Sequence, residues 1–549
     1  MLLRAYGFVL MVGMVSVGAQ APRKEAVPQN PLGAITFPAT GNPKAHAAFI
    51  RGVLWLHSFG YEEAIDAFRT AQVIDPIFVM AYWGEAMSFN QPLWFGEEPD
   101  KARAALGKLG PSPAERATKA KTVREQMYLA AIEALYGTGA KAARDLAFAT
   151  AMTALAGRFP QDDEAQAFYA LSLLATLPRG DQAVPLRERA GAIAEGVFKR
   201  NPRHPGAPHY ILHAYDHPAL AARALPAARA YAKIAPAASH ALHMPAHAFV
   251  QLGLWQEAAA SDEASWEASI AWQKRRGASI ALRDFHSLSW LQYEWTQQGR
   301  FDKSIGALMQ VMEALKVVKD GGEVGGHHYS DSEIGRGSGL MALRNDHGSM
   351  RARHVIESER WVDMKNQMSF DNVDELFALG MSAARTGDVA KAKTCLDLLQ
   401  KADAAGQDPG LREQAAIMVE EMRALIAMAG GRPIEAIAAM ERATVLQGRM
   451  PKPIGRPYPV KGADELLGEI LLQAGRAKEA VSWFERALVR TPNRSRAVLG
   501  LARAAAKAGE ATKSHRAYQQ FLNNWRQADP GLPELQEART AIAVKKQED

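Results

Sequence analysis

Histidine is the residue type whose placement in this chain points most directly to chemistry. Seven of the fifteen histidines lie between residues 204 and 247. Within that stretch, His209 and His213 are four residues apart, and so are His243 and His247. In a helix this spacing places both imidazoles of a pair on one face, one turn apart. Because imidazole suits zinc and copper, each pair offers two ligands to a metal ion.

The two histidine pairs are also related to each other. His209 precedes His243 by 34 residues, and His213 precedes His247 by the same 34 residues. First helices of adjacent hairpins pack about 8–10 Å apart, so imidazoles from both can reach one ion at a bond length of about 2 Å. We therefore predict one zinc or copper site made by these four histidines. Carboxylates that could complete or orient the site follow nearby: Asp216, Asp262, Glu263 and Asp284.

The elements that must position these histidines are repeated helical hairpins. The chain is rich in alanine and poor in β-branched residues, which favours helix throughout. A period of 34 residues with small and aromatic residues at fixed offsets indicates stacked hairpins. The clearest copy begins at Ala45, and further copies begin at Lys461 and near Val373. The first copy contains Gly52, Trp55, Ala64, Phe68, Ala71 and Pro76.

This pattern resembles the tetratricopeptide-repeat (TPR) family. The resemblance implies an all-α, right-handed superhelical solenoid whose concave groove binds a protein or peptide. In the family, groove residues come from the second, fifth, ninth, twelfth and thirteenth positions of the repeat. Carried onto this chain, with neighbouring aromatic residues added, the predicted groove contains His209, His213, His240, His243, His247, His286, Tyr210, Trp83 and His57.

The amino terminus predicts export. Arg4 precedes an apolar stretch from Ala5 to Val17, and Val17-Gly18-Ala19 is typical of a signal-peptidase site. We predict cleavage after Ala19 and a location in the periplasm or outside the cell, with no later membrane span. The formal net charge of +6 is too mild for this length to indicate a nucleic-acid partner. The segments 208–218 and 243–255 resemble those of an exported bacterial subgroup of TPR proteins.

Composition along the chain predicts six segments. They are a signal peptide (1–19), an extended linker (20–43), an N-terminal TPR-like array with the histidine-lined groove (44–319), a glycine-rich loop (320–348), a C-terminal TPR array (349–535) and a polar tail (536–549). A long loop inside an array of short turns is usually functional or disordered. In a metalloenzyme this loop would be a candidate lid, with His327 or His328 entering the site.

Three interpretations of the histidines remain open at this point. They could bind a metal, line a polar groove for a peptide or glycan, or form internal hydrogen bonds in an irregular stack. The sequence favours an exported TPR scaffold that binds a peptide or protein partner, with a metal as an option. The alternative is a zinc- or copper-dependent enzyme that uses the histidine cluster. The residue types identify no catalytic group.

Overall fold

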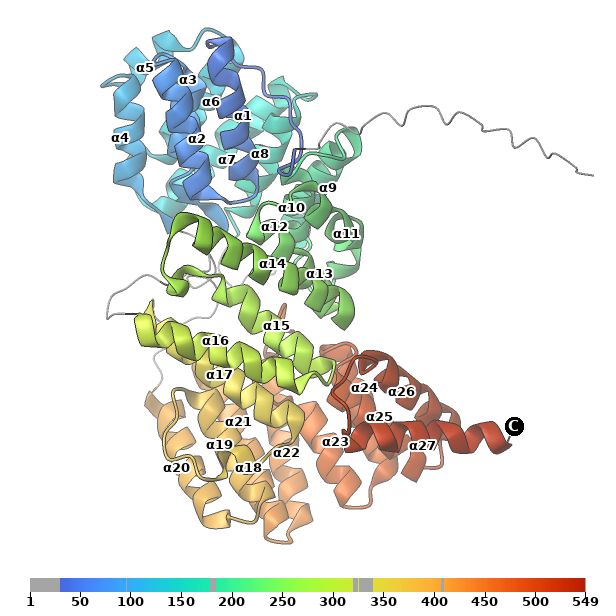
Figure 1. The fold of residues 1–549 in the computed structure, drawn as a ribbon. Coiled ribbons are helices and arrows are strands. Elements are labelled where there is room, and N and C mark those ends of the chain that lie inside the picture. The colour runs from blue at the N-terminus through green and yellow to red at the C-terminus, as the bar shows by residue number, and fades with distance from the viewer. Residues whose placement is uncertain are drawn as a thin grey trace, which may run out of the picture. The chain divides into compact units, whose positions relative to one another are not determined.

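The computed structural model describes residues 30–94, 96–177, 184–318, 324, 339–405 and 409–548. All elements discussed below belong to the compact unit Pro31–Asp549. The predicted signal peptide, His327 and His328 lie outside the described residues. Over the described ranges the fold is all-α and of the TPR type (Figure 1). The described strands are β1 (Asn90–Gln91) and β2 (Gly96–Glu97), which pair antiparallel.

The first part of the chain contains these elements: α1 (Pro43–His57), α2 (Tyr61–Ile74), α3 (Val79–Met87), η1 (Pro92–Trp94), α4 (Pro99–Leu109), α5 (Pro113–Lys119), α6 (Val123–Leu135), α7 (Lys141–Arg158), α8 (Asp163–Leu174), α9 (Val184–Arg200), α10 (Gly206–Ala214), η2 (Ala221–Ala224), α11 (Leu225–Ile234), α12 (Ser239–His243), α13 (Pro245–Gln251), α14 (Trp255–Arg276), η3 (Ile280–Leu282), α15 (Phe285–Gln297) and α16 (Phe301–Val317).

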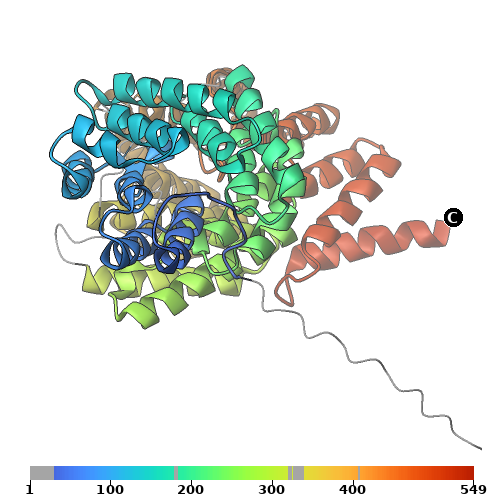
Figure 2. The ribbon, with the colours of Figure 1, turned by 90° about the horizontal axis from the view of Figure 1, so that it is seen from above.

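The second part contains α17 (Leu340–Ser358), α18 (Val362–Lys365), α19 (Val373–Arg385), α20 (Val389–Ala405), α21 (Pro409–Ala429), α22 (Pro433–Arg449), α23 (Ala463–Gln473), α24 (Ala477–Arg490), α25 (Ser495–Lys507), α26 (Ala511–Asn524) and α27 (Pro533–Glu548). Consecutive helices pack as hairpins, for example α1 with α2, α19 with α20, and α25 with α26. Figure 2 shows the same ribbon from above.

Glycines on first helices allow the hairpins to stack around buried aromatic rings. A Cβ added at Gly52 or at Gly84 would lie only 2.6 or 2.3 Å from the ring of Phe68. At Gly500 it would lie 2.2 Å from Phe484. Phe68 and Phe484 are both buried. The small residues that marked the repeat in the sequence are therefore required by close packing between neighbouring hairpins.

Two predicted segment boundaries differ from the structure. Residues 340–348, placed in the glycine-rich loop, belong to α17, and residues 536–548 of the predicted polar tail belong to α27, in which Ala538 is buried. Residues 31–42 of the predicted linker are non-helical but pack on the array, where the Phe37 ring contacts Phe49 and Tyr128. In each case apolar side chains within a largely polar segment find partners in the repeats.

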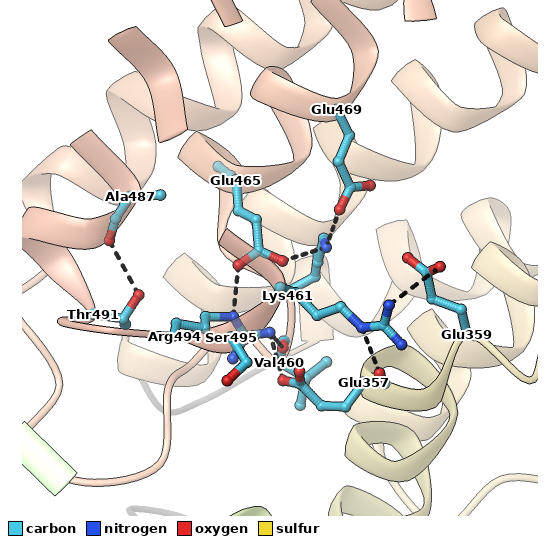
Figure 3. Close-up of polar contacts among 12 residues, drawn as sticks. Glu357, Glu359, Val460, Lys461, Glu465, Glu469, Ala487, Thr491, Arg494 and Ser495 are labelled. Carbon is cyan, nitrogen blue, oxygen red and sulfur yellow. Dashed lines mark hydrogen bonds and ion pairs between the residues drawn. The ribbon is translucent and has the colours of Figure 1, made fainter. Parts of the chain in front are cut away.

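A buried ion network joins the C-terminal helices to α15 and α17. Arg494, which is 2% exposed, contacts Glu465 of α23 and Glu357 of α17, each at 2.6 Å. It also approaches the Tyr293 hydroxyl of α15 at 3.3 Å. Lys461 contacts Glu465 on the other side of the same network (Figure 3). These contacts hold the start of α23 and the 460–462 segment against helices from the middle of the chain.

Candidate metal centre

Four short helices position the histidine side chains. α10 carries His209 and His213 on one face. The next repeat is broken into α12 and α13 because Pro245 lacks an N–H and begins a new helix after Met244. His243 therefore ends α12, and His247 follows on α13. The amino terminus of α15 carries His286, and Asp284 caps that helix by accepting from the Ser287 N–H at 3.1 Å.

The structure sorts these histidines into two groups of three. His209, His213 and His240 form one group, triad A; His243, His247 and His286 form the other, triad B. Within each group one ligand nitrogen from every residue lies within 4.8 Å of the others. The four histidines that spacing placed at one candidate site, namely His209, His213, His243 and His247, are thus divided between the two triads. The third histidine of each triad comes from the second position of the following repeat, and sequence spacing alone did not show this partnership.

Triad A converges on the Nε2 atom of His209. That atom lies 2.9 Å from Nε2 of His240 and 3.0 Å from Nε2 of His213. The Nδ1 atom of His209 lies 2.6 Å from the backbone carbonyl oxygen of His57, so Nδ1 must donate its hydrogen there. In the neutral ring Nε2 then has one lone pair, yet two imidazole nitrogens point at it. A metal cation among the three nitrogens would satisfy this arrangement.

Two carboxylates contact the histidines of triad B on the sides of the rings that face away from the candidate ion. The Nε2 atoms of His243 and His247 lie 3.1 Å apart. On the far sides of the two rings, Nδ1 of His243 is 2.6 Å from Asp262, and Nδ1 of His247 is 2.9 Å from Asp216. A carboxylate on Nδ1 orients a histidine and raises its basicity as a metal ligand. Gln251 in turn donates to Asp216 at 2.7 Å, which fixes that carboxylate.

Burial keeps the central imidazoles neutral. It lowers the pKa of His209 and that of His243 to about 3 in each case. Both side chains are buried, whereas His213 and His286 are half-buried. Since a metal binds the neutral imidazole, these two rings are in the ligating form near neutral pH without any proton to displace. The half-buried histidine leaves each triad one side that is nearer to solvent.

The spacing of the nitrogens suits a small cation. Tetrahedral zinc with Zn–N bonds of about 2.0–2.1 Å separates its ligand nitrogens by about 3.3–3.4 Å. The Nε2–Nε2 separations of 2.9 and 3.0 Å in triad A and 3.1 Å in triad B are slightly shorter. An ion would thus need only small outward movements of the rings. Three histidines also leave a fourth coordination position, as in catalytic zinc sites.

A third cluster explains the predicted groove residues His57 and Tyr210. His57, Glu164 and His204 are completely buried. His57 contacts Glu164 at 2.7 Å and the Tyr210 hydroxyl at 2.9 Å, and His204 contacts Glu164 at 3.1 Å. Burial raises the pKa of Glu164, but the two histidines more than offset this and bring it to about 2. Because the Ala207 N–H donates to Nδ1 of His204, the neutral His204 ring carries its hydrogen on Nε2, which faces Glu164. His57, Glu164 and His204 are also close enough together to form a third group that could hold a metal ion.

Seven of the nine predicted groove residues are buried, and the other two, His213 and His286, are half-buried. His57, Tyr210 and Trp83 are each no more than 1% exposed. His57 nonetheless bears on the site, because its backbone oxygen fixes the tautomer of His209. Of the four carboxylates predicted nearby, Asp216 and Asp262 contact triad B, whereas Glu263 pairs with Lys303 at 2.7 Å and Asp284 caps α15.

Two aromatic residues at the triads were not identified from the sequence. The Phe59 ring contacts all three imidazoles of triad A, and the Trp290 ring contacts all three of triad B. Neither belongs to the histidine pattern, and Phe59 lies some 150 residues before His209. Only the packing of α1 beside α10 brings Phe59 to triad A.

Comparisons with known proteins add little to this picture. No protein-family model and no curated protein matched the chain. Among solved structures, the chain is similar to the crystal structure of yeast Tom70 with 13% sequence identity and a TM-score of 0.30. The match covers 92% of this chain and 96% of that chain. At this TM-score the likeness carries no argument about function. The class of protein is set by the helical repeats described above.

None of the helices in the described ranges combines the length and apolar character that crossing a bilayer requires.

Proposed function

We propose that this chain is a helical-repeat metalloprotein that holds one zinc or copper ion at triad A and one at triad B. The observation that carries the proposal is the convergence of three imidazole nitrogens at each triad. The Nε2–Nε2 separations are 2.9 and 3.0 Å in triad A and 3.1 Å between His243 and His247 of triad B. The orientation of the rings by the His57 carbonyl, Asp262 and Asp216 supports it. Zinc and copper are the ions that imidazole ligands favour under ordinary conditions.

The repeat positions of the six histidines support the same proposal. Each triad takes two histidines from the fifth and ninth positions of one repeat and one from the second position of the next. Ordinary core packing in a repeat array uses small and apolar residues at such contacts. A buried group of three imidazoles is costly unless its polar atoms are satisfied. Two copies of this arrangement in adjacent repeats therefore favour ligation over structural hydrogen bonding.

The proposal is tested by metal analysis of the full-length protein without a polyhistidine tag. We expect elemental analysis after reconstitution with zinc, or separately with copper, to find about two ions per chain. Circular dichroism of the same samples should show unchanged helix content, because the helices pack through the apolar cores of the repeats. A parent protein that retains neither metal after dialysis would reject the proposal.

A carboxylate behind the ligands provides a finer prediction. Replacing Asp262 by asparagine should weaken zinc binding at triad B by about 10–100-fold, the range seen when a ligand loses its hydrogen-bonding partner. Competition with a chromophoric chelator measures this change. Glu263→Gln is the matched control, since the neighbouring carboxylate pairs with Lys303 and contacts no histidine of the triad. Equal zinc affinity in the parent and in Asp262→Asn would contradict the assigned role of this carboxylate.

Metal-dependent catalysis is a second candidate function. It is supported by the half-buried position of His213 and of His286, since a fourth ligand could approach from that side. A bound ion there would act as a Lewis acid or activate water. A screen for hydrolysis that is lost on metal removal and restored by zinc tests this candidate; equal rates with and without zinc reject it.

Binding of a protein or peptide partner is a third candidate, supported by the TPR-type fold itself. A partner would dock outside the triads, because His240, His243 and His247 are no more than 8% exposed. Export to the periplasm or beyond, with cleavage after Ala19, is proposed from the amino-terminal pattern alone. Mass spectrometry of the mature protein decides it: an intact amino terminus would reject cleavage.

A further inference from the structure

Phe59 occupies an unusual backbone position at the end of α1. In seven described hairpins, the two helices are joined by three residues of which the middle one has a positive φ. Six of these middle residues are glycines, namely Gly253, Gly299, Gly387, Gly431, Gly475 and Gly509. In the first hairpin the residue is Phe59, with φ of 55°. A bulky side chain in the left-handed region is strained and needs a compensating contact.

The Phe59 side chain makes that contact with triad A. Its ring centroid lies 4.3 Å from the ring of His209, 5.4 Å from that of His240 and 5.8 Å from that of His213. The ring is stacked on His213 and His240 and edge-on to His209. Phe59 is only 1% exposed. One aromatic ring thus touches all three imidazoles of the triad and keeps water from the part of it that the ring covers.

Triad B has an equivalent aromatic ring from a different part of the repeat. Trp290, in the middle of α15, lies 4.5 Å from His247, 5.4 Å from His243 and 5.6 Å from His286 between ring centroids. Gly455 from the segment after α22 packs on its outer side, where an added Cβ would be 2.5 Å from the indole. Phe59 is a turn residue and Trp290 a helix residue, so the shared feature is not inherited from the repeat pattern. An aromatic ring in contact with all three imidazoles is therefore a feature of the two triads.

We propose that Phe59 is a positioning residue of triad A, retained at a turn position that otherwise holds glycine because its ring fixes the three imidazoles and limits hydration of the ion. The inference rests on the proposed metal binding. The apolar shell of a metal site controls solvent access and ligand orientation. Loss of the ring should therefore speed the departure of the ion from triad A. Triad B, covered by Trp290, should not respond.

The test is a zinc-release measurement on each triad separately. His247→Ala leaves triad A as the only complete triad, and His213→Ala leaves triad B. In the first background, Phe59→Gly should release zinc to 4-(2-pyridylazo)resorcinol at least tenfold faster. In the second background, the same substitution should leave the release rate unchanged. Because glycine adopts the left-handed conformation of this turn readily, the comparison measures the effect of losing the ring without a change in the backbone.

A matched control separates positioning from general loss of stability. Phe68→Leu alters a buried ring in the same repeat that packs on Gly52 and Gly84 rather than on a triad. It should lower the melting temperature without changing either release rate. If Phe59→Gly does not fold, Phe59→Leu replaces it in the test, because leucine keeps an apolar side chain. Phe59→Leu should release zinc from triad A at a rate between those of the parent residue and Phe59→Gly. Unchanged release from triad A, or equal acceleration at both triads, would overturn the inference. A parent protein without zinc would instead reject the proposed function.

Discussion

Replacing His213 by alanine is expected to remove one of two bound ions, and replacing His247 is expected to remove the other. Each change leaves two imidazoles at one triad and three at the other. Losing a direct ligand should weaken binding by more than the roughly 10–100-fold caused by loss of a ligand's hydrogen-bonding partner. Elemental analysis after dialysis against a weak chelator should therefore find about one ion in each single variant. The double variant should retain none.

This experiment also separates two arrangements of ligands. If His209, His213, His243 and His247 shared one ion, as their spacing predicted, either single variant would lose all the metal. His515→Ala is the matched control, because His515 lies on α26 and belongs to neither triad. It should retain the parental stoichiometry. Two ions retained in both His213→Ala and His247→Ala would show that the triads do not bind the metal.

Replacing Arg494 by alanine is expected to lower the free energy of unfolding by about 3–5 kcal/mol. The guanidinium is buried between Glu465 and Glu357, so its removal leaves Glu357 without its ion-pair partner and Glu465 with Lys461 alone. Those carboxylates belong to α23 and α17 (Figure 3). Urea denaturation followed by circular dichroism measures the change. The loss should come mainly from uncompensated charge, because breaking a buried pair costs more than the pair contributes.

Two further variants make the Arg494 prediction specific. Arg476→Ala removes an arginine from an exposed pair with Glu479 and should leave the free energy of unfolding nearly unchanged. Adding Glu357→Gln to Arg494→Ala should recover part of the loss, since it removes the buried carboxylate that is left without its partner. A loss below about 1 kcal/mol in Arg494→Ala would indicate that water reaches the network.

Much of the fold could be predicted because a repeat encodes the same local choice many times. Gly52 and Phe68 in the first copy indicate a hairpin, and Gly468 and Phe484 indicate the same hairpin again. Prediction was weaker where the period is interrupted. Residues 340–348 and 536–548 were assigned to a loop and a tail by composition, although both are helical. Helix formation there depends on contacts with the preceding repeats, which local composition does not report.

The candidate site was found in part for the same reason. The fifth and ninth positions of two adjacent repeats predicted that His209, His213, His243 and His247 would gather. The carboxylates Asp216 and Asp262 were among the nearby candidates. Their distance along the sequence gave no reason to prefer Asp216 and Asp262 over Glu263 as partners of the histidines. In the structure, Glu263 pairs with Lys303 instead. A difference of one residue along a helix changes the face by about 100°, so only the actual packing decides such a choice.

The sequence by itself determined that this protein is a stack of helical hairpins with histidines in phase with the repeat. Those features follow from local spacing, which is set by helix geometry and does not require long-range contacts. The tertiary structure alone decided how the histidines are grouped. The break at Pro245 places His240 and His243 on one five-residue helix, with one histidine in each triad. The packing of α1 and α15 then supplies Phe59, the His57 carbonyl, His286 and Trp290, because contacts between distant helices are what bring distant residues together.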